Sequence, residues 1–395
     1  MTRVTLVGAT DPAAAVAFIE IGAVVLALSF LARFAGRLGI TAIPFYLVAG
    51  LTVGDGGIAP LQLSETFISL TADIGVLLLL LALGLEYNAD ELRAGLRTGA
   101  RGGLLDAALN FTPGFAAGVL LGWGVTTAAL LGGVTWISSS GVVSKVLHDL
   151  DRFGFRETPV VLNLLVLEDL AMAVYLPVFG AIIAGTALLV TVLNVSVALA
   201  VVALILALAL RWGHLLSSML SRGSDEALLL GIFGLTLLVG GLAQQVEVSS
   251  AIGAFLVGLA LSGPVQLRAG PLIQPLRDLF AATFFFFFSF QLQPGEVAGA
   301  LVPAVLLGAA AIGTKVVTGW MLCRGLGPRA RLRAGATLSA RGEFSIVIAS
   351  LGAAGAFGPQ LTALAAAFVL VTAMVGPLLA KYADRLPLPG ALAPP

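Results

Sequence analysis

The sequence predicts an all-α polytopic membrane protein. Only 11% of its 395 residues are charged and 59% are hydrophobic, whereas a soluble domain carries about 25% charged residues. Residues 107–144, 170–210 and 344–380 contain no Asp, Glu, Lys or Arg. Each stretch is long enough for nearly two spanning helices of about 20 residues. A β-barrel would require short alternating segments instead.

Polar connections that contain Gly and Pro divide the chain into about thirteen transmembrane helices. Their predicted ranges are 13–35, 40–54, 66–86, 101–121, 125–147, 158–183, 187–210, 226–245, 249–263, 272–291, 297–322, 331–354 and 359–381. The positive-inside rule tests this division. With the N-terminus outside, Arg3 lies outside and Lys315 and Arg341 lie within spans, and every other Lys and Arg falls on the inner side. This distribution predicts a cytoplasmic C-terminus.

Thirteen spans divide into six, one and six, which is the plan of two inverted six-helix repeats joined by a linker helix. A weak sequence similarity between the two halves of the chain agrees with this plan. The fifth span contains GVTWISSSGVV (133–143) and the twelfth contains GATLSARGEFSIV (335–347). Both place Gly, Ser and Thr in the middle of a span, where glycine permits unwinding. We therefore expect two broken helices, whose freed carbonyls and hydroxyls can coordinate a cation.

The composition argues against several other classes of protein. The net charge is zero, so nothing indicates nucleic acid binding, and the single cysteine, Cys323, excludes an intramolecular disulfide. No GxSxG, HExxH, CxxC or P-loop motif occurs, so we expect no enzyme and no cofactor. The first apolar run contains Glu20 and lacks a small-residue cleavage site, which indicates a retained first helix.

Two adjacent acids lie within the apolar run LLVLEDLAMAVYLPV (164–178). A charge at the centre of a spanning helix costs about 2.5–3.5 kcal/mol on insertion scales, so such a group should face a cavity or another charge. Because burial disfavours the ionised form, Asp169 is expected to hold either a proton or a small cation. The alternative is that Asp169 has only a structural role, as one member of a buried ion pair.

Glu168 points about 100° away from Asp169 on a helix, so the two acids need not share a partner. Lys315 is the lysine deep within a span, and a Glu168–Lys315 pair would satisfy both charges. The alternative is that Lys315 snorkels to an interface. Within the second expected break, Arg341 and Glu343 are expected to offset the dipoles of the half-helices or each other.

For the other intramembrane acids and for one aromatic run, the sequence supports less specific predictions. The acids are expected to line an access funnel or to cap helix ends; they are Glu20, Asp73, Glu86 and Asp106. The run FFFFF (284–288) is expected to form a packing surface that faces lipid or an interface.

The chain resembles the Kef-type and NapA-type cation:proton antiporters over essentially its full length. The resemblance rests on Lys315 and on four segments taken together, which are ETPVVLNLLVLEDLAM (157–172), WISSSGVVSKVL (136–147), PLRDLFAATFFFFFSFQL (275–292) and ARGEFSIVI (340–348).

This resemblance implies an NhaA-like fold in which two broken helices cross near the midplane, in a homodimer within the cytoplasmic membrane. It implies a dimerisation part at about 1–100 and 211–296, a core part at about 101–183 and 297–381, and a linker helix at about 187–210. The family's ion-binding aspartate maps onto Asp169, and its acid–lysine pair maps onto Glu168 and Lys315. Its crossing-helix hydroxyls map near three residues, Thr135, Ser138 and Ser139.

The implied function is secondary active exchange of K⁺ or Na⁺ for protons by alternating access. Kef-type chains usually have Gln at the position of Glu168 and NapA-types usually have Asp, so the transported cation stays open. Kef-type chains also commonly continue into a cytoplasmic nucleotide-binding domain, whereas this sequence stops at Pro395. The alternatives are a separate regulatory subunit, no regulator, or a truncated chain. A sodium-coupled symporter for an organic solute is the rival function, and it would need a larger polar pocket.

Overall fold

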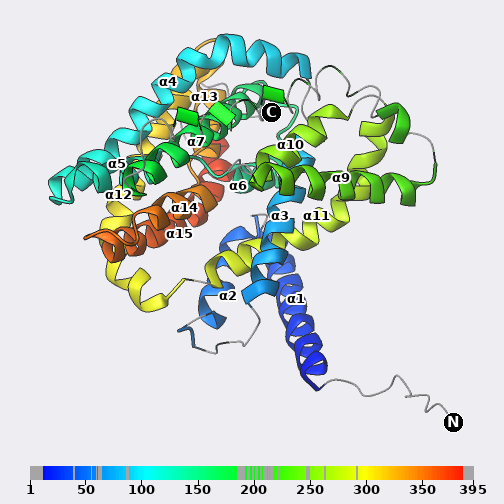
Figure 1. Ribbon diagram of the computed structural model, residues 1–395, viewed down its shortest axis with the longest axis horizontal. Coiled ribbons are helices and arrows are strands. Elements are labelled where there is room, and N and C mark those ends of the chain that lie inside the picture. Colours follow the sequence, from blue (N-terminus) through cyan, green and yellow to red (C-terminus); the bar gives the residue numbers. More distant parts are fainter. Residues whose placement is uncertain are drawn as a thin grey trace.

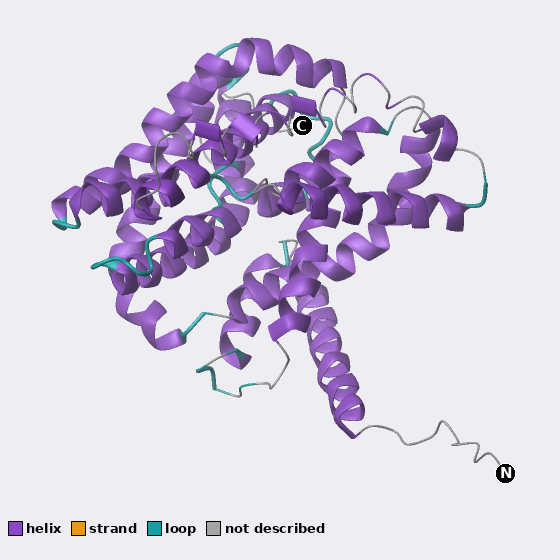
Figure 2. Cartoon of the chain, in the orientation of Figure 1, coloured by secondary structure: helices purple, strands orange, loops and turns teal. Residues whose placement is uncertain are grey.

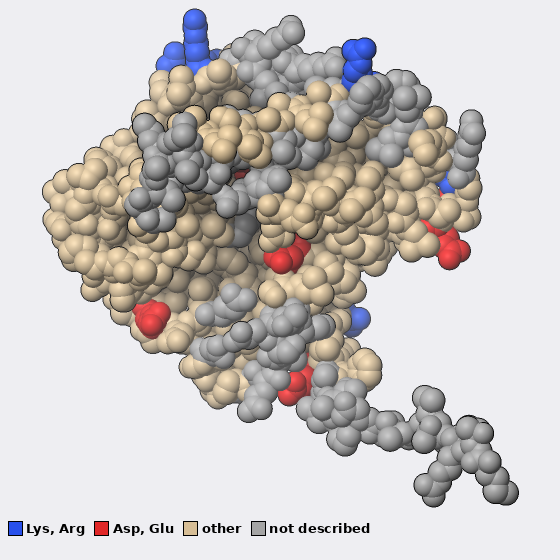
Figure 3. Space-filling model, in the orientation of Figure 1, with Lys and Arg blue, Asp and Glu red and all other residues tan. Residues whose placement is uncertain are grey.

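The computed structural model describes residues 12–38, 41–54, 56–58, 60, 65–85, 89–184, 217–220, 223–245, 250–261, 264–290 and 292–385, with scattered positions between 192 and 213. All regular elements in these ranges are helical (Figure 2). Nine helical segments of the described residues are long and apolar enough to cross a membrane, and two further apolar helices are shorter. The surface in Figure 3 is correspondingly poor in charged side chains.

The helices of the first half are α1 (Pro12–Leu38), α2 (Ile43–Val53), α3 (Glu65–Leu85), α4 (Ala89–Leu120), α5 (Gly124–Trp136), α6 (Ser140–Asp149) and α7 (Thr158–Ala184). Helix α4 begins before the predicted start of its span at residue 101. The extra turns contain charged residues, and for that reason the sequence placed them outside the span. The helix nevertheless includes them, because a helix can continue beyond the membrane surface. The second span was predicted to be short, and α2 is short.

The helices of the second half are α9 (Asp225–Gln245), α10 (Ser250–Ala260), α11 (Pro264–Phe290), α12 (Pro294–Leu322), α13 (Pro328–Thr337), α14 (Glu343–Leu351) and α15 (Gly358–Tyr382), followed by the 3₁₀ turn η1 (Ala383–Arg385). Most of the predicted linker helix at 187–210 lies outside the described residues. The count of thirteen spans and the inverted repeats therefore stay predictions.

The helices pack in two groups (Figure 1). The first, which we call the scaffold group, contains α1, α2, α3, α9, α10 and α11, with α3 packed on both α10 and α11. The second, the core group, contains α4 to α7 and α12 to α15. Contacts between the groups run mainly through α3 against α6 and α2 against α15. Each group therefore joins helices from both halves of the sequence.

Glycines allow the scaffold helices to approach closely. A Cβ atom placed on Gly258 of α10 would lie 2.4 Å from the Leu81 carbonyl oxygen of α3. A Cβ on Gly84 of α3 would lie 2.2 Å from the Phe255 carbonyl oxygen. Both distances are far shorter than a van der Waals contact, so a side chain at either position would force the two backbones apart. Small residues serve this purpose at many membrane helix interfaces.

Of the two alternatives for the phenylalanine run, a surface that faces lipid or one that faces an interface, the first does not hold for four of its five members. Residues 284–287 are each at most 5% exposed, and only Phe288 is partly exposed. The run lies on α11, which packs against α2, α3 and α9. Consecutive helical residues point about 100° apart and so cover every face. Because α11 has neighbours on several sides, most of these rings are buried in the scaffold group.

Gly258→Ala tests the close approach of α3 and α10. We expect the substitution to destabilise the detergent-solubilised protein by about 1–3 kcal/mol, because overpacking displaces backbone rather than a flexible side chain. Thermal unfolding measures the effect. Gly234→Ala on α9 is the matched control, since a Cβ there meets nothing within 4 Å. If Gly258→Ala and the control had the same melting temperature, the close approach of α3 and α10 would be contradicted.

Candidate functional site at the helix crossing

Two broken helices meet at the centre of the core group. The interruption between α5 and α6 lies against the one between α13 and α14. The Ser139 amide donates a hydrogen bond of 2.9 Å to the Ala340 carbonyl, and the Ser138 hydroxyl donates one of 3.2 Å to the Leu338 carbonyl. The two interruptions expected from the sequence are thus both present, and each satisfies polar groups that the other leaves without helical partners.

Arg341 occupies the point where α5 and α13 end. Its guanidinium is fully buried. The Nε atom donates 2.9 Å to the Thr135 carbonyl at the end of α5, and one terminal nitrogen donates 3.0 Å to Leu338 and 2.9 Å to Ser339 beyond α13. The C-terminal end of a helix carries partial negative charge, so a cation is favourable there. Arg341 therefore compensates two helix dipoles at once.

Glu168 on α7 faces the α5–α6 interruption and α12. Its carboxylate accepts hydrogen bonds from the Ser138 amide at 2.6 Å and the Ser138 hydroxyl at 3.1 Å. The Lys315 ammonium lies 2.5 Å from the same carboxylate. The ion pair expected between Glu168 and Lys315 is present, and Lys315 is fully buried rather than snorkelling to a membrane interface. Each carboxylate oxygen of Glu168 thus has a protein partner.

Asp169 points to a different neighbour. The Ser140 hydroxyl, in the first turn of α6, lies 3.2 Å and 3.4 Å from its two carboxylate oxygens. Asp169 is 8% exposed, against 2% for Glu168 and none for Lys315. The rotation of about 100° between adjacent helical residues separates the two acids. One acid is held in an ion pair, and the other lies at the positive end of α6 and is slightly less buried.

Asp106 on α4 belongs to this site, although the sequence suggested only a place in a funnel or at a helix end. Its side chain is fully buried and lies 2.7 Å from the Lys315 ammonium. The Asn110 amide donates to it at 2.8 Å and the Trp136 indole at 3.0 Å. The spacing of Asp106 and Asn110, four residues apart on one helix face, was the available signal. What the sequence did not reveal was that this face meets α12.

The other selected hydroxyls have local partners. The Thr135 hydroxyl donates 2.9 Å to the Asn110 carbonyl, which ties α5 to α4. The Ser139 hydroxyl accepts a hydrogen bond of 3.2 Å from the Val142 amide and so caps α6. Glu343 begins α14, and its side chain lies outside the described residues. Ser140, which the sequence analysis did not select for the cation site, supplies the hydroxyl beside Asp169.

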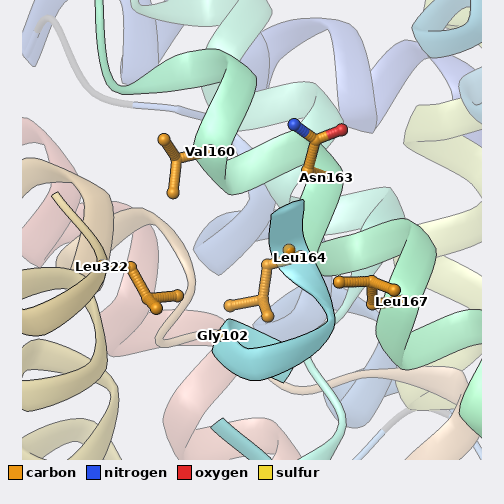
Figure 4. A pocket seen from close by; sticks show the side chains of 7 residues that line it. Gly102, Val160, Asn163, Leu164, Leu167 and Leu322 are labelled. Carbon is orange, nitrogen blue, oxygen red and sulfur yellow. The ribbon is translucent and has the colours of Figure 1, made fainter. Parts of the chain in front are cut away.

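A pocket of about 220 Å³ lies between α4, α7 and α12 (Figure 4). Gly102 and Leu164 line it, and each lies four residues before one of the buried acids, Asp106 and Glu168. The pocket therefore starts about one helical turn from the ion pair. Its lining consists of two glycines, one Val, three Leu and Asn163, which suits an apolar occupant better than an ion.

Arg341→Met removes the charge that holds the ends of α5 and α13. We expect a loss of about 3–5 kcal/mol in the free energy of unfolding, as when one member of a buried charged network is removed, because three carbonyls would each lose the hydrogen bond from the guanidinium. Thermal unfolding in detergent measures the loss. Arg324→Met changes an exposed arginine and is the control. Equal melting temperatures for the two variants would refute the capping role.

Ser139→Ala and Ser140→Ala should separate stability from ion binding. Loss of the cap at Ser139 costs stability, typically about 1 kcal/mol, and leaves the Asp169 carboxylate its hydroxyl neighbour. Loss of the Ser140 hydroxyl removes an oxygen beside Asp169 and should weaken binding of the cation that the sequence analysis expects there, with a smaller effect on melting. Melting curves with and without alkali chloride distinguish the two outcomes. The reverse pattern would show that the two hydroxyls had been assigned the wrong roles.

Comparison with known proteins agrees with this architecture. Residues 23–381 match the family model described as sodium/hydrogen exchanger, transmembrane. The potassium/proton antiporter subunit KhtU of Bacillus subtilis is 34% identical over 381 residues, which cover 93% of each chain. The ammonium/proton antiporter subunit AmhT of Alkalihalophilus pseudofirmus is 31% identical over 371 residues, which cover 92% of each chain.

Among solved structures, the sodium/proton antiporter MjNhaP1 of Methanocaldococcus jannaschii has the same fold. The TM-score is 0.70, with 93% of this chain and 96% of that chain covered, at 15% sequence identity. A likeness at this identity concerns the fold alone. The match of the family model over most of the sequence, together with the full-length relatives, shows that the chain belongs to the sodium/hydrogen exchanger family.

Proposed function

We propose that this protein is a secondary active antiporter that exchanges a monovalent cation, K⁺ or Na⁺, for protons by alternating access. The observation that carries the proposal is that the two adjacent acids of α7 have different partners. Glu168 is held by Lys315 and Ser138, whereas Asp169 lies at the start of α6 and is the more exposed of the two acids. The relatives named as potassium/proton and ammonium/proton antiporter subunits support the same reaction class.

Competition at Asp169 couples the two fluxes. A carboxylate that has taken up a proton no longer attracts a cation, and a carboxylate that holds a cation disfavours protonation. If the site faces one side of the membrane at a time, each binding event displaces the other ion. The Asp169 carboxylate and the Ser140 hydroxyl are the first oxygens of the proposed cation shell. Hydroxyls and carbonyls of the α5–α6 interruption, at Thr135 and Ser138, are proposed to complete it, whereas Ser139, the third residue that the resemblance implied, caps α6 through its hydroxyl.

Alternating access requires one rigid part to move against another. The core group carries all the residues of the site, while the scaffold group contacts it mainly through α3 and α2. This division supports a moving core and a stationary scaffold. We propose that the scaffold dimerises through apolar side chains such as Phe18 and Phe30 of α1, which are 77% and 65% exposed. The proposed membrane is the cytoplasmic one, with the N-terminus outside.

A separate regulatory subunit also belongs to the proposal, because KhtU and AmhT are both named as subunits. The rival function, sodium-coupled symport of an organic solute, would require polar groups that surround the solute. The pocket beside the buried acids has mostly apolar lining residues. This lining does not supply the polar groups that the symporter would need.

Asp169→Asn should abolish exchange and leave the fold intact, since the amide replaces the carboxylate at nearly equal volume and cannot bind a proton in its place. Proteoliposomes with a trapped pH dye and an imposed proton gradient provide the assay. Chlorides of potassium, sodium, lithium, ammonium and choline are added in turn. We expect one or more of the first four to dissipate the gradient in wild type and none to do so faster than protein-free liposomes in Asp169→Asn.

Glu226→Gln is the matched control, because Glu226 is an exposed acid at the start of α9. It should exchange at the wild-type rate. Exchange retained by Asp169→Asn would refute the role of this residue. If no inorganic cation moved protons in wild type and an organic anion entered with sodium, the symporter would replace the antiporter.

A further inference from the structure

The Lys315 ammonium is held by two carboxylates from two helices. Asp106 of α4 lies 2.7 Å from the Nζ atom, and Glu168 of α7 lies 2.5 Å from it. All three side chains are at most 2% exposed. A single counter-ion would already balance a buried lysine, so the second carboxylate calls for an explanation beyond charge compensation.

Asp106 is itself held in place. Asn110, one turn later on α4, donates to the same Asp106 oxygen that faces Lys315, and the Trp136 indole at the end of α5 donates to the other oxygen. Two threonines on α12, Thr314 and Thr318, hydrogen-bond to the Asn110 side chain at 2.8 Å and 3.1 Å. These contacts attach the turn of α12 that carries Lys315 to α4. Asp106 and its partners on α4 thereby restrain the Lys315 ammonium on the side opposite α7.

An ammonium group is a monovalent cation attached to the protein beside the proposed cation site. Glu168 already attracts it, and Asp169 is the next residue on the same helix. Without a second anchor, the flexible lysine chain would be free to move toward this pair of acids and compete with the transported cation. Arg341, the other buried cation of the site, interacts electrostatically with Glu168 and Asp106 and is tied to backbone carbonyls. Lys315 is therefore the buried cation that would compete if its anchor on α4 were lost.

We propose that Asp106 is a positioning residue that restrains the Lys315 ammonium on the α4 side and so leaves Asp169 of α7 available to the transported cation. The residue does not contact the cation in this arrangement. Its effect is on how much cation is needed to fill the site, while the movement of the core group and the maximal exchange rate depend on other parts of the protein. The inference rests on the proposed exchange of cations for protons.

The test measures how exchange depends on cation concentration in proteoliposomes, with potassium chloride and sodium chloride as the probes and choline chloride as the balancing salt. In Asp106→Asn we expect the concentration for half-maximal exchange, KM, to rise about tenfold, which is mid-range for coupling within a shared buried network. The maximal rate should change by less than about twofold. A twofold change corresponds to about 0.4 kcal/mol, which is below the smallest coupling energy typical of residues in one network, about 0.5 kcal/mol. Asp106→Glu, which keeps the charge, should restore KM most of the way.

A double-mutant cycle separates restraint of the lysine from a general loss of structure. In the Lys315→Gln background the competing ammonium is absent, so adding Asp106→Asn should leave KM unchanged. Thr236→Val removes a buried hydroxyl from α9 of the scaffold group and is the control for loss of a buried polar group. It should leave KM at the wild-type value.

Three outcomes would overturn the inference: an unchanged KM in Asp106→Asn, a fall in maximal rate alone, or an equal rise in KM with and without Lys315. If Asp106→Asn does not fold, Asn110→Ala takes its place: it removes the amide that holds the Asp106 carboxylate and should raise KM by a smaller factor. Melting temperature against cation concentration then gives an affinity without transport. Absence of exchange in wild type would refute the proposed function, whereas exchange with an Asp106-independent KM would refute this inference alone.

Discussion

The structure depends on the compensation of charge where water is scarce. Four buried charged side chains surround the helix crossing, namely Asp106, Glu168, Lys315 and Arg341, and each is at most 2% exposed. Leaving one such charge without a partner typically costs several kcal/mol, so they must be arranged together. Lys315 joins α4 to α7 and α12, and Arg341 joins the ends of α5 and α13. The interruptions of the two broken helices, which would be costly in isolation, are stable because these groups satisfy them.

The same arrangement makes Asp169 chemically distinct from its neighbour. Glu168 and Asp169 are adjacent in sequence, have nearly the same chemistry and lie on one helix. The difference in their partners comes from the helical rotation between them. One carboxylate completes the ion pair with Lys315, and the other meets the Ser140 hydroxyl at the start of α6. A fixed acid beside a slightly more exposed one suits the proposed exchange, because the fixed pair would preserve the geometry while Asp169 changed its occupant.

Much of the fold and part of the site could be predicted from the sequence. The charge-free stretches identify spanning helices, and the Gly- and Ser-rich motifs locate both interruptions. Glu168 and Lys315 could be paired because few other partners lie within spans. The sequence left open whether the phenylalanine run of α11 faces lipid or an interface, because apolar side chains look alike in sequence whether they meet lipid or another helix. Asp106 was undervalued for a related reason: its partner Lys315 is 209 residues away in the chain.

The sequence by itself determined the class of the molecule, the positions of most helices and the acid on α7 around which the proposed chemistry is arranged. These features follow from local properties, namely hydropathy over about 20 residues and the backbone freedom of glycine. Only the tertiary structure decided that Asp106 is the second counter-ion of Lys315, that Arg341 caps two helices and that Ser140 rather than Ser139 faces Asp169. Those assignments depend on which helix faces meet across distant parts of the chain, and local sequence does not specify that.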